Sequence, residues 1–274
     1  MDVFDMSQSN INKTKPFIDF NTPGYILCLI VGFPENLYVI WLIVTGAGNG
    51  VASEFFSLNL SVCEILLCLQ SLLSLLCGVF PTLFQVVGFL LGICISGRPL
   101  FQCLICVDCY LAVVHPITFL KFKPLRYRVI CCAVAWIMIV FACVILTLNS
   151  TGFQMHLFLC CCLGQAVLTL SVKLFCCVAV LRALKQSGPG ERRSKEKAKE
   201  NHMKRRAFNI IVMIILAVLL IYAAYLAAAI IYILTHQFIS ELWVAGNICF
   251  VLGGLVQPLL YLHRTGRLPF CKAP

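Results

Sequence analysis

The sequence predicts an all-α seven-transmembrane helix bundle, and three observations lead to this fold class. Of the 274 residues, 61% are hydrophobic and only 12% are charged, whereas a soluble domain has roughly 45–50% apolar and about 25% charged residues. The mean hydropathy is +0.96, so too few polar residues remain to cover a globular core. Apolar stretches of the length that a spanning helix needs, about 20 residues, recur seven times along the chain.

The seven predicted spans are separated by short segments that are polar or rich in glycine and proline. They fall at Gly24–Val44, Phe55–Val79, Thr82–Val114, Val129–Leu148, Met155–Leu184, Ala207–Leu234 and Ile239–Leu262. Two boundaries are weak, because the turn at Pro81 is short and because Gly97, Arg98 and Pro99 interrupt the third span. The polar start, Met1–Asn12, has no charged-then-apolar leader, so we expect the first span to act as its own insertion signal.

The basic residues predict the orientation, because lysine and arginine beside short loops stay on the cytoplasmic side. Most of the 21 lie after span three, after span five or in the tail. We therefore expect an extracellular amino terminus over residues 1–23 and a bundle over 24–263, with a basic third cytoplasmic loop at 185–206. Residues 264–274 form the cytoplasmic tail. Asn12 begins an Asn-Lys-Thr triplet on the outer side and is a candidate glycosylation acceptor.

The net charge of +10 is accounted for by this cytoplasmic face beside anionic lipid, so no nucleic acid partner is expected. The 18 cysteines do not indicate a disulfide scaffold, since most of them lie inside apolar runs. We expect these to be small core residues, namely Cys28, Cys63, Cys94, Cys131, Cys132, Cys143, Cys176 and Cys177.

Four charged side chains fall inside the predicted spans, namely Glu35, Glu64, Arg98 and Lys173. Charges at membrane depth cost about 2.5–3.5 kcal/mol each on insertion scales, and so usually mark a pair or a function. Glu64 and Arg98 each lie about ten residues, or roughly 15 Å, from the inner ends of antiparallel spans two and three. We therefore expect an ion pair, with Asn36 and Gln257 near the same level in a mid-membrane polar network. The alternative is that the pair only locks the bundle, and Lys173 is expected to extend toward the cytosol.

Short motifs occur in order along these spans. They are Asn36 in span one, Asn59–Glu64 in span two, Asp108-Cys109-Tyr110 at the end of span three, Trp136 in span four, and Gln257-Pro258-Leu259-Leu260-Tyr261 in span seven. Over roughly Gly24–Phe270 the chain resembles the rhodopsin-like (class A) G protein-coupled receptors. The loop Thr118–Arg128 is similar to that of the nucleotide and hydroxy-acid receptor branch.

The resemblance implies a plasma-membrane receptor that transmits an extracellular ligand signal through the lipid bilayer to a heterotrimeric G protein. It implies that Pro258 and Tyr261 act as a conformational switch, and that His263–Phe270 begins a short amphipathic helix after the seventh span. The side chains that would face the G protein are Asp108, Cys109, Tyr110, Lys204, Arg205 and Arg206. No ligand-binding residue is indicated.

The chain also departs from the family's pattern. The family's arginine is Cys109 here, so Asp108 loses its neighbouring cation, and coupling to the G protein is expected to be weak. The family's sodium-binding aspartate is Glu64, and Arg98 would occupy the cation's place. No tryptophan or proline lies between Asn201 and Glu241, so the usual hinge of helix six is missing.

The usual cysteine at the outer end of helix three is absent near Phe84. A disulfide from Cys77 to the run Cys160–Cys162 remains an open alternative.

Other functional classes fit less well. A receptor-like protein that binds or traffics without efficient G protein coupling is favoured by Cys109, whereas Tyr110, Tyr261 and the basic loops favour signalling. A transporter or channel would use the charges at membrane depth, but paired charges argue against a conducting path. An enzyme is not expected, because no Ser/His/Asp set or glycine-rich phosphate loop occurs, and neither a metal nor a cofactor is expected. The outer halves of the spans are nearly uncharged, which fits an apolar ligand or none.

Overall fold

The structure is a computed structural model, and it describes residues 22–45, 54–77, 79–115, 117–119, 124–148, 152–186 and 240–264, together with the helical positions 223, 226, 227, 230, 231 and 234. Its elements are η1 (Cys28–Gly32), α2 (Phe33–Val44), α3 (Phe55–Leu76), η2 (Pro81–Leu83), α4 (Phe84–Val114), α6 (Leu125–Leu148), α7 (Gly152–Gln186) and α9 (Ser240–Arg264). Most of the predicted sixth span, Ala207–Leu234, lies outside the described residues. So do Asn12, Lys204, Arg205, Arg206 and the chain beyond Arg264.

Six of the seven predicted spans fall on the described residues, and each of them is helical. Four helices there are long and apolar enough to cross a membrane, namely Thr22–Val44, Phe55–Leu76, Phe84–Val114 and Leu163–Ala183. The predicted start of the fourth span, at Val129, was wrong, because α6 begins at Leu125. This earlier start places Arg126 and Arg128 in the first turn of the helix rather than in the preceding loop.

The third span is a single helix despite Gly97, Arg98 and Pro99. Helix α4 continues through Pro99 for 31 residues, although a proline removes one backbone hydrogen bond and crowds the preceding turn. The side-chain amide of Gln165 on α7 donates to the Ser96 carbonyl at 2.9 Å. A neighbouring helix therefore supplies a donor beside the proline.

The first span contains a π-helical turn, η1, before it continues as α2. The Phe33 amide donates to the carbonyl of Cys28, five residues earlier. Pro34 follows directly and has no amide hydrogen to continue the α-helical pattern. π-turns of this kind are rare and often occur beside functional sites.

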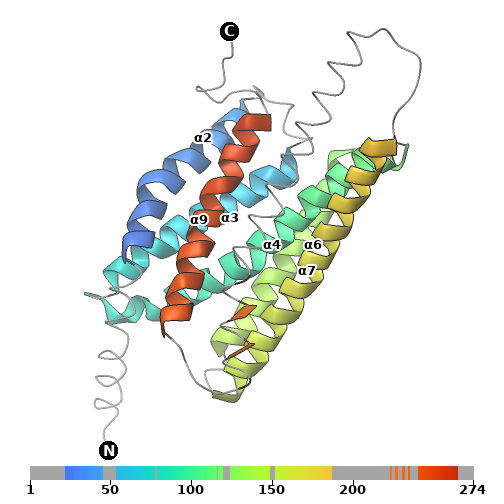
Figure 1. The fold of residues 1–274 in the computed structure, drawn as a ribbon. Coiled ribbons are helices and arrows are strands. Elements are labelled where there is room, and N and C mark those ends of the chain that lie inside the picture. Colours follow the sequence, from blue (N-terminus) through green and yellow to red (C-terminus); the bar gives the residue numbers. More distant parts are fainter. Residues whose placement is uncertain are drawn as a thin grey trace, which may run out of the picture.

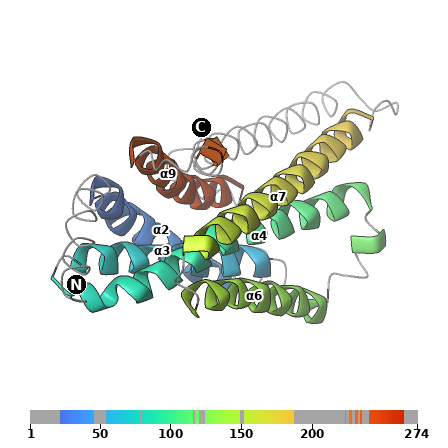
Figure 2. The same ribbon diagram turned by 90° about the horizontal axis from the view of Figure 1, so that it is seen from below.

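Helix α4 lies at the centre of the arrangement, with α2, α3 and α9 on one side and α6 and α7 on the other (Figure 1). It packs against α3, α6 and α7, while α2 packs against α3 and α9. The view from below shows α7 running alongside α4 and α6 lying beneath it (Figure 2). Side chains of α4 can therefore contact spans two, four and five.

Cysteines fill much of the helix packing, as the sequence predicts. Cys28, Cys63, Cys94, Cys132, Cys143 and Cys176 are buried, and Cys177 is half-buried. The prediction was wrong for Cys131, which is exposed, because it lies on the outward face of α6. Cys77, Cys160 and Cys161 are free thiols, so none of these three forms the disulfide that the sequence left open.

Large apolar side chains cover the outside of the helices. Ile30, Ile137 and Phe141 are 68%, 68% and 67% exposed. Apolar side chains of this size on the surface are expected where lipid, rather than water, surrounds the helices. The pattern is that of a multi-pass membrane protein.

Candidate functional site

The predicted ion pair between Arg98 and Glu64 is present in the structure. The Arg98 Nε donates to Glu64 Oε1 at 2.6 Å, and Nη2 donates to Oε2 at 2.5 Å. The two side chains are only 2% and 3% exposed. The guanidinium therefore meets both oxygens of the carboxylate, in the two-pronged geometry that makes arginine–carboxylate pairs specific as well as strong.

The same arginine also contacts the seventh span. Its Nη1 donates to the backbone carbonyl of Phe250 on α9, and its guanidinium carbon lies 3.8 Å from the centroid of the Phe250 ring. A planar guanidinium can donate in its plane and stack on an aromatic ring at the same time. Arg98 thus joins α3, α4 and α9 at one point.

Two glycines allow this close approach of helices. A Cβ added at Gly254 would lie 2.6 Å from both Arg98 Nη2 and Glu64 Oε2, and one added at Gly97 would lie 3.0 Å from the Sγ of Cys63. Gly254 therefore provides the space on α9 in which the ion pair lies. The only signal for this residue in the sequence is the Gly253-Gly254 pair within an apolar span.

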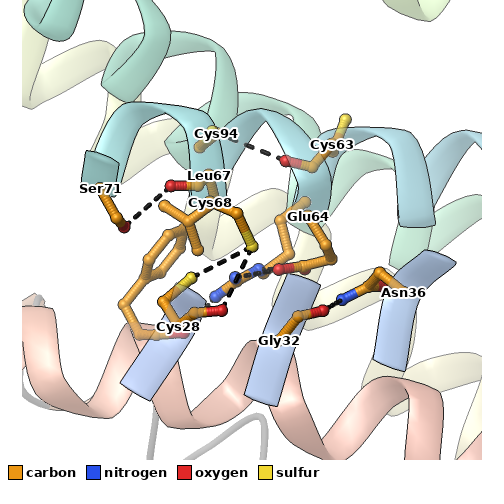
Figure 3. A network of polar contacts seen from close by, with 11 residues as sticks. Cys28, Gly32, Asn36, Cys63, Glu64, Leu67, Cys68, Ser71 and Cys94 are labelled. Carbon is orange, nitrogen blue, oxygen red and sulfur yellow. Dashed lines mark hydrogen bonds and ion pairs between the residues drawn. The ribbon is translucent and has the colours of Figure 1, made fainter. Parts of the chain in front are cut away.

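The ion pair is held against a layer of buried thiols. The Sγ atoms of Cys28 and Cys68 are 3.5 Å apart, and the Cys68 thiol also donates to the Cys28 carbonyl at 3.4 Å. Cys94 donates to the carbonyl of Cys63 at 3.7 Å. Figure 3 shows these thiols beside Glu64, between the first span, α3 and α4. Thiols are small and weakly polar, so the charges are surrounded mainly by neutral groups.

The structure describes only some of the other predicted members of the polar network. Asn36 is buried, and its amide donates to the Gly32 carbonyl of its own span at 2.9 Å (Figure 3). Among the described residues, its Oδ1 has no hydrogen-bond partner. The side chains of Gln257 and Tyr261 lie outside the described residues, while Pro258 is buried within α9. The participation of Asn36 and Gln257 in the network stays a prediction.

The expectation that Lys173 extends toward the cytosol was wrong. Its side chain is 4% exposed, and its Nζ donates to the Oε1 of Gln102 at 2.9 Å. Gln102 lies one turn after Arg98 on α4, so it offers a polar acceptor at the depth of the lysine. A buried acceptor within reach removes the advantage that the ammonium would gain by extending to the membrane surface.

At the carboxyl end of α4, Asp108 has an ionic partner that the sequence does not indicate. The Nη2 of Arg128 on α6 lies 2.8 Å from one carboxylate oxygen of Asp108 and 3.1 Å from the other. Cys109 is exposed, and the Tyr110 hydroxyl lies 3.2 Å from the Nε2 of His115. Asp108, which has no cation beside it in the sequence, is therefore paired with an arginine of another helix.

Two of the motif residues contact each other across the bundle. The indole Nε1 of Trp136 on α6 donates to the Oδ1 of Asn59 on α3 at 2.9 Å. The Trp136 ring also packs against Phe101 of α4, with ring centroids 5.4 Å apart. Within the described residues no three metal-ligating side chains converge.

Comparison with known proteins agrees with this arrangement. The chain matches the family described as 7 transmembrane receptor (rhodopsin family) over residues 35–261. It is 25% identical over 238 residues to the uracil nucleotide/cysteinyl leukotriene receptor of Rattus norvegicus, and the alignment covers 78% of this chain and 67% of that receptor. The receptor of the same name from Mus musculus gives the same identity and coverage. These relatives are consistent with the resemblance to the nucleotide receptor branch.

Proposed function

Because the chain belongs to the rhodopsin family of seven-transmembrane receptors, and is thus a G protein-coupled cell-surface receptor, we propose that Arg98 takes the place of a bound cation in its polar core. The observation that supports this proposal is the ion pair between Arg98 and Glu64. Both oxygens of Glu64 accept from the guanidinium, at 2.6 Å and 2.5 Å. A sodium ion would have to compete for these oxygens with a positive charge that is covalently attached to α4 and always protonated.

Sodium dependence tests this proposal. We expect the melting temperature of the purified receptor to be the same in sodium chloride and in choline chloride of equal ionic strength. Arg98→Ser, which frees the Glu64 carboxylate, should become more stable in sodium chloride than in choline chloride. Lys173→Ser is the matched control, because it removes a buried cation of α7 that donates to Gln102, and it should show no sodium effect. A saturable, sodium-specific stabilisation of the wild type would contradict the proposal.

Coupling to the G protein is proposed to be weak. The inner end of α4 presents Asp108, Cys109 and Tyr110, and Cys109 is exposed there. A cysteine has neither the length nor the charge of the arginine that the family carries at this place. The basic residues Lys204, Arg205 and Arg206 are proposed to complete the surface that meets the G protein, while Pro258 and Tyr261 act as the switch in span seven.

The proposed location is the plasma membrane, with the amino terminus outside and the carboxyl terminus in the cytoplasm. The asymmetry of lysine and arginine supports this orientation, and it makes Asn12 accessible to glycosylation. Digestion with an N-glycosidase should lower the apparent mass of the wild type but not that of Asn12→Gln. A wild type with no sensitivity to the enzyme would remove the support for an external amino terminus.

The ligand is proposed to be apolar rather than anionic. The outer halves of the spans carry almost no basic side chains, whereas a nucleotide's phosphates are usually held by arginine or lysine. Uridine nucleotides are the direct probe, because the relatives are named for them. We expect them to produce no saturable response in cells that express the receptor. A saturable response above that of mock-transfected cells would contradict this proposal.

A further inference from the structure

A second ion pair joins α4 and α6 at the cytoplasmic end of the bundle. One terminal nitrogen of Arg128 lies within hydrogen-bond distance of both carboxylate oxygens of Asp108, at 2.8 Å and 3.1 Å. The Arg128 side chain is 3% exposed and the Asp108 side chain is 27% exposed. Arg128 is thus a buried cation whose carboxylate partner borders the cytoplasmic surface.

Aromatic rings from two other segments surround the same guanidinium. Its central carbon lies 5.5 Å from the ring centroid of Phe56, at the start of α3, and 5.8 Å from that of Phe119. Phe119 belongs to the short helical segment 117–119 between α4 and α6. Cations at this distance are attracted to the ring faces, so Arg128 contacts side chains of three segments besides its own helix.

The segment between α4 and α6 is fixed near both of its ends. After α4, the Phe119 amide donates to the His115 carbonyl at 2.9 Å, and His115 contacts the hydroxyl of Tyr110 at 3.2 Å. Before Arg128, the Tyr127 amide donates to the Pro124 carbonyl at 3.2 Å. These local bonds shape each end of the segment separately. Within the described residues, the Asp108–Arg128 pair is an ionic contact that holds the two ends relative to each other.

We propose that Arg128 is a positioning residue for G protein engagement. By holding Asp108 across the α4–α6 interface, it fixes the described ends of the second cytoplasmic loop, residues 115, 117–119 and 124, relative to each other. The proposal rests on the proposed function, since it requires that this loop meets a G protein. The sequence between these ends carries Lys121 and Lys123, whose charges suit an acidic partner surface.

The experiment is a double-mutant cycle with two readouts. The variants are Arg128→Gln, Asp108→Asn and the double change, and each keeps a hydrogen-bonding side chain of similar size. Arg126→Gln is the matched control, because it removes the same charge two residues away from an exposed position. The first readout is nucleotide exchange on G protein in membranes, normalised to delivered receptor. The second is amide hydrogen exchange of residues 115–127 in purified receptor without G protein.

We expect each single change at the pair to lower nucleotide exchange at least about fivefold, and the double change to be no worse than the poorer single variant. Hydrogen exchange at the Phe119 and Tyr127 amides should rise in all three variants. Arg126→Gln should leave both readouts within about twofold of the wild type. Additive losses in the double variant, or an equal loss in Arg126→Gln, would overturn the proposal.

The two readouts separate this proposal from the proposed function. A wild type that stimulates no G protein contradicts the proposed function, while loop amides that loosen only when the pair is broken still support the positioning role of Arg128. Loop amides that are unchanged in Arg128→Gln overturn the positioning role, whatever the nucleotide exchange assay gives.

Discussion

The change Gly254→Ala tests how tightly the seventh span is fitted to the ion pair. The added Cβ would lie 2.6 Å from both Arg98 Nη2 and Glu64 Oε2, whereas ordinary contact begins at 3.4 Å. Both partners would therefore have to move by about 0.8 Å, and the two prongs of the pair cannot both be kept. Neither side chain can move freely, because Glu64 is bonded to Arg98 and Arg98 is also bonded to the carbonyl of Phe250.

The expected loss follows from two opposing terms. Overpacking a well-filled core costs about 1–3 kcal/mol, and we take the upper value because a buried ion pair is disturbed. Alanine in place of glycine within a helix stabilises the fold by about 1 kcal/mol. The net loss is about 2 kcal/mol, which corresponds to a fall of roughly 4–8 °C in melting temperature for a protein of this size.

The assay is thermal unfolding of the purified receptor, with Gly164→Ala as the matched control. Gly164 also lies within a helix, but a Cβ there meets nothing within 4 Å, so its melting temperature should stay the same or rise. In an Arg98→Leu background, Gly254→Ala should cost much less, because the guanidinium is gone. Equal melting temperatures for Gly254→Ala and the wild type would refute the reasoning, as would an unchanged loss in the Arg98→Leu background.

Two further predictions concern coupling and helix packing. Cys109→Arg should raise nucleotide exchange on G protein above that of the wild type, because arginine supplies the missing charge and length. A robust wild-type exchange rate that is unchanged or lower in Cys109→Arg would contradict this prediction. Trp136→Phe removes the hydrogen bond to Asn59 and should lower the melting temperature by about 2–4 °C, whereas Trp41→Phe, at a position 56% exposed, should not. Equal effects of the two tryptophan changes would count against a role for that bond.

The ion pair could be predicted from the sequence because depth in a membrane helix follows from counting. A fixed rise per residue places Glu64 and Arg98 at one level. Because an unpaired charge at that depth is costly, the two are expected to pair. The same counting gave six helical spans that the described residues contain. It could not identify Gly254, because a close approach between helices that are distant in sequence leaves no periodic signal.

The wrong predictions for Lys173 and Arg128 have different physical causes. Lys173 was expected to extend toward the cytosol because its acceptor on α4, Gln102, becomes a neighbour only through the packing of α4 against α7. Arg128 was counted as a loop cation, since the predicted fourth span began at Val129. The structure begins that helix at Leu125, and one extra turn is enough to place the guanidinium against Asp108.

The most direct test of the central claim, that Arg98 and Glu64 form the polar core of the bundle, is a double-mutant cycle on surface delivery and melting temperature. Glu64→Gln and Arg98→Leu should each lower both quantities, since breaking a buried pair by removing one partner costs about 3–5 kcal/mol. The double change leaves no unpaired charge and should regain at least about half of the loss. A double variant that loses the sum of the two single losses would contradict the claim.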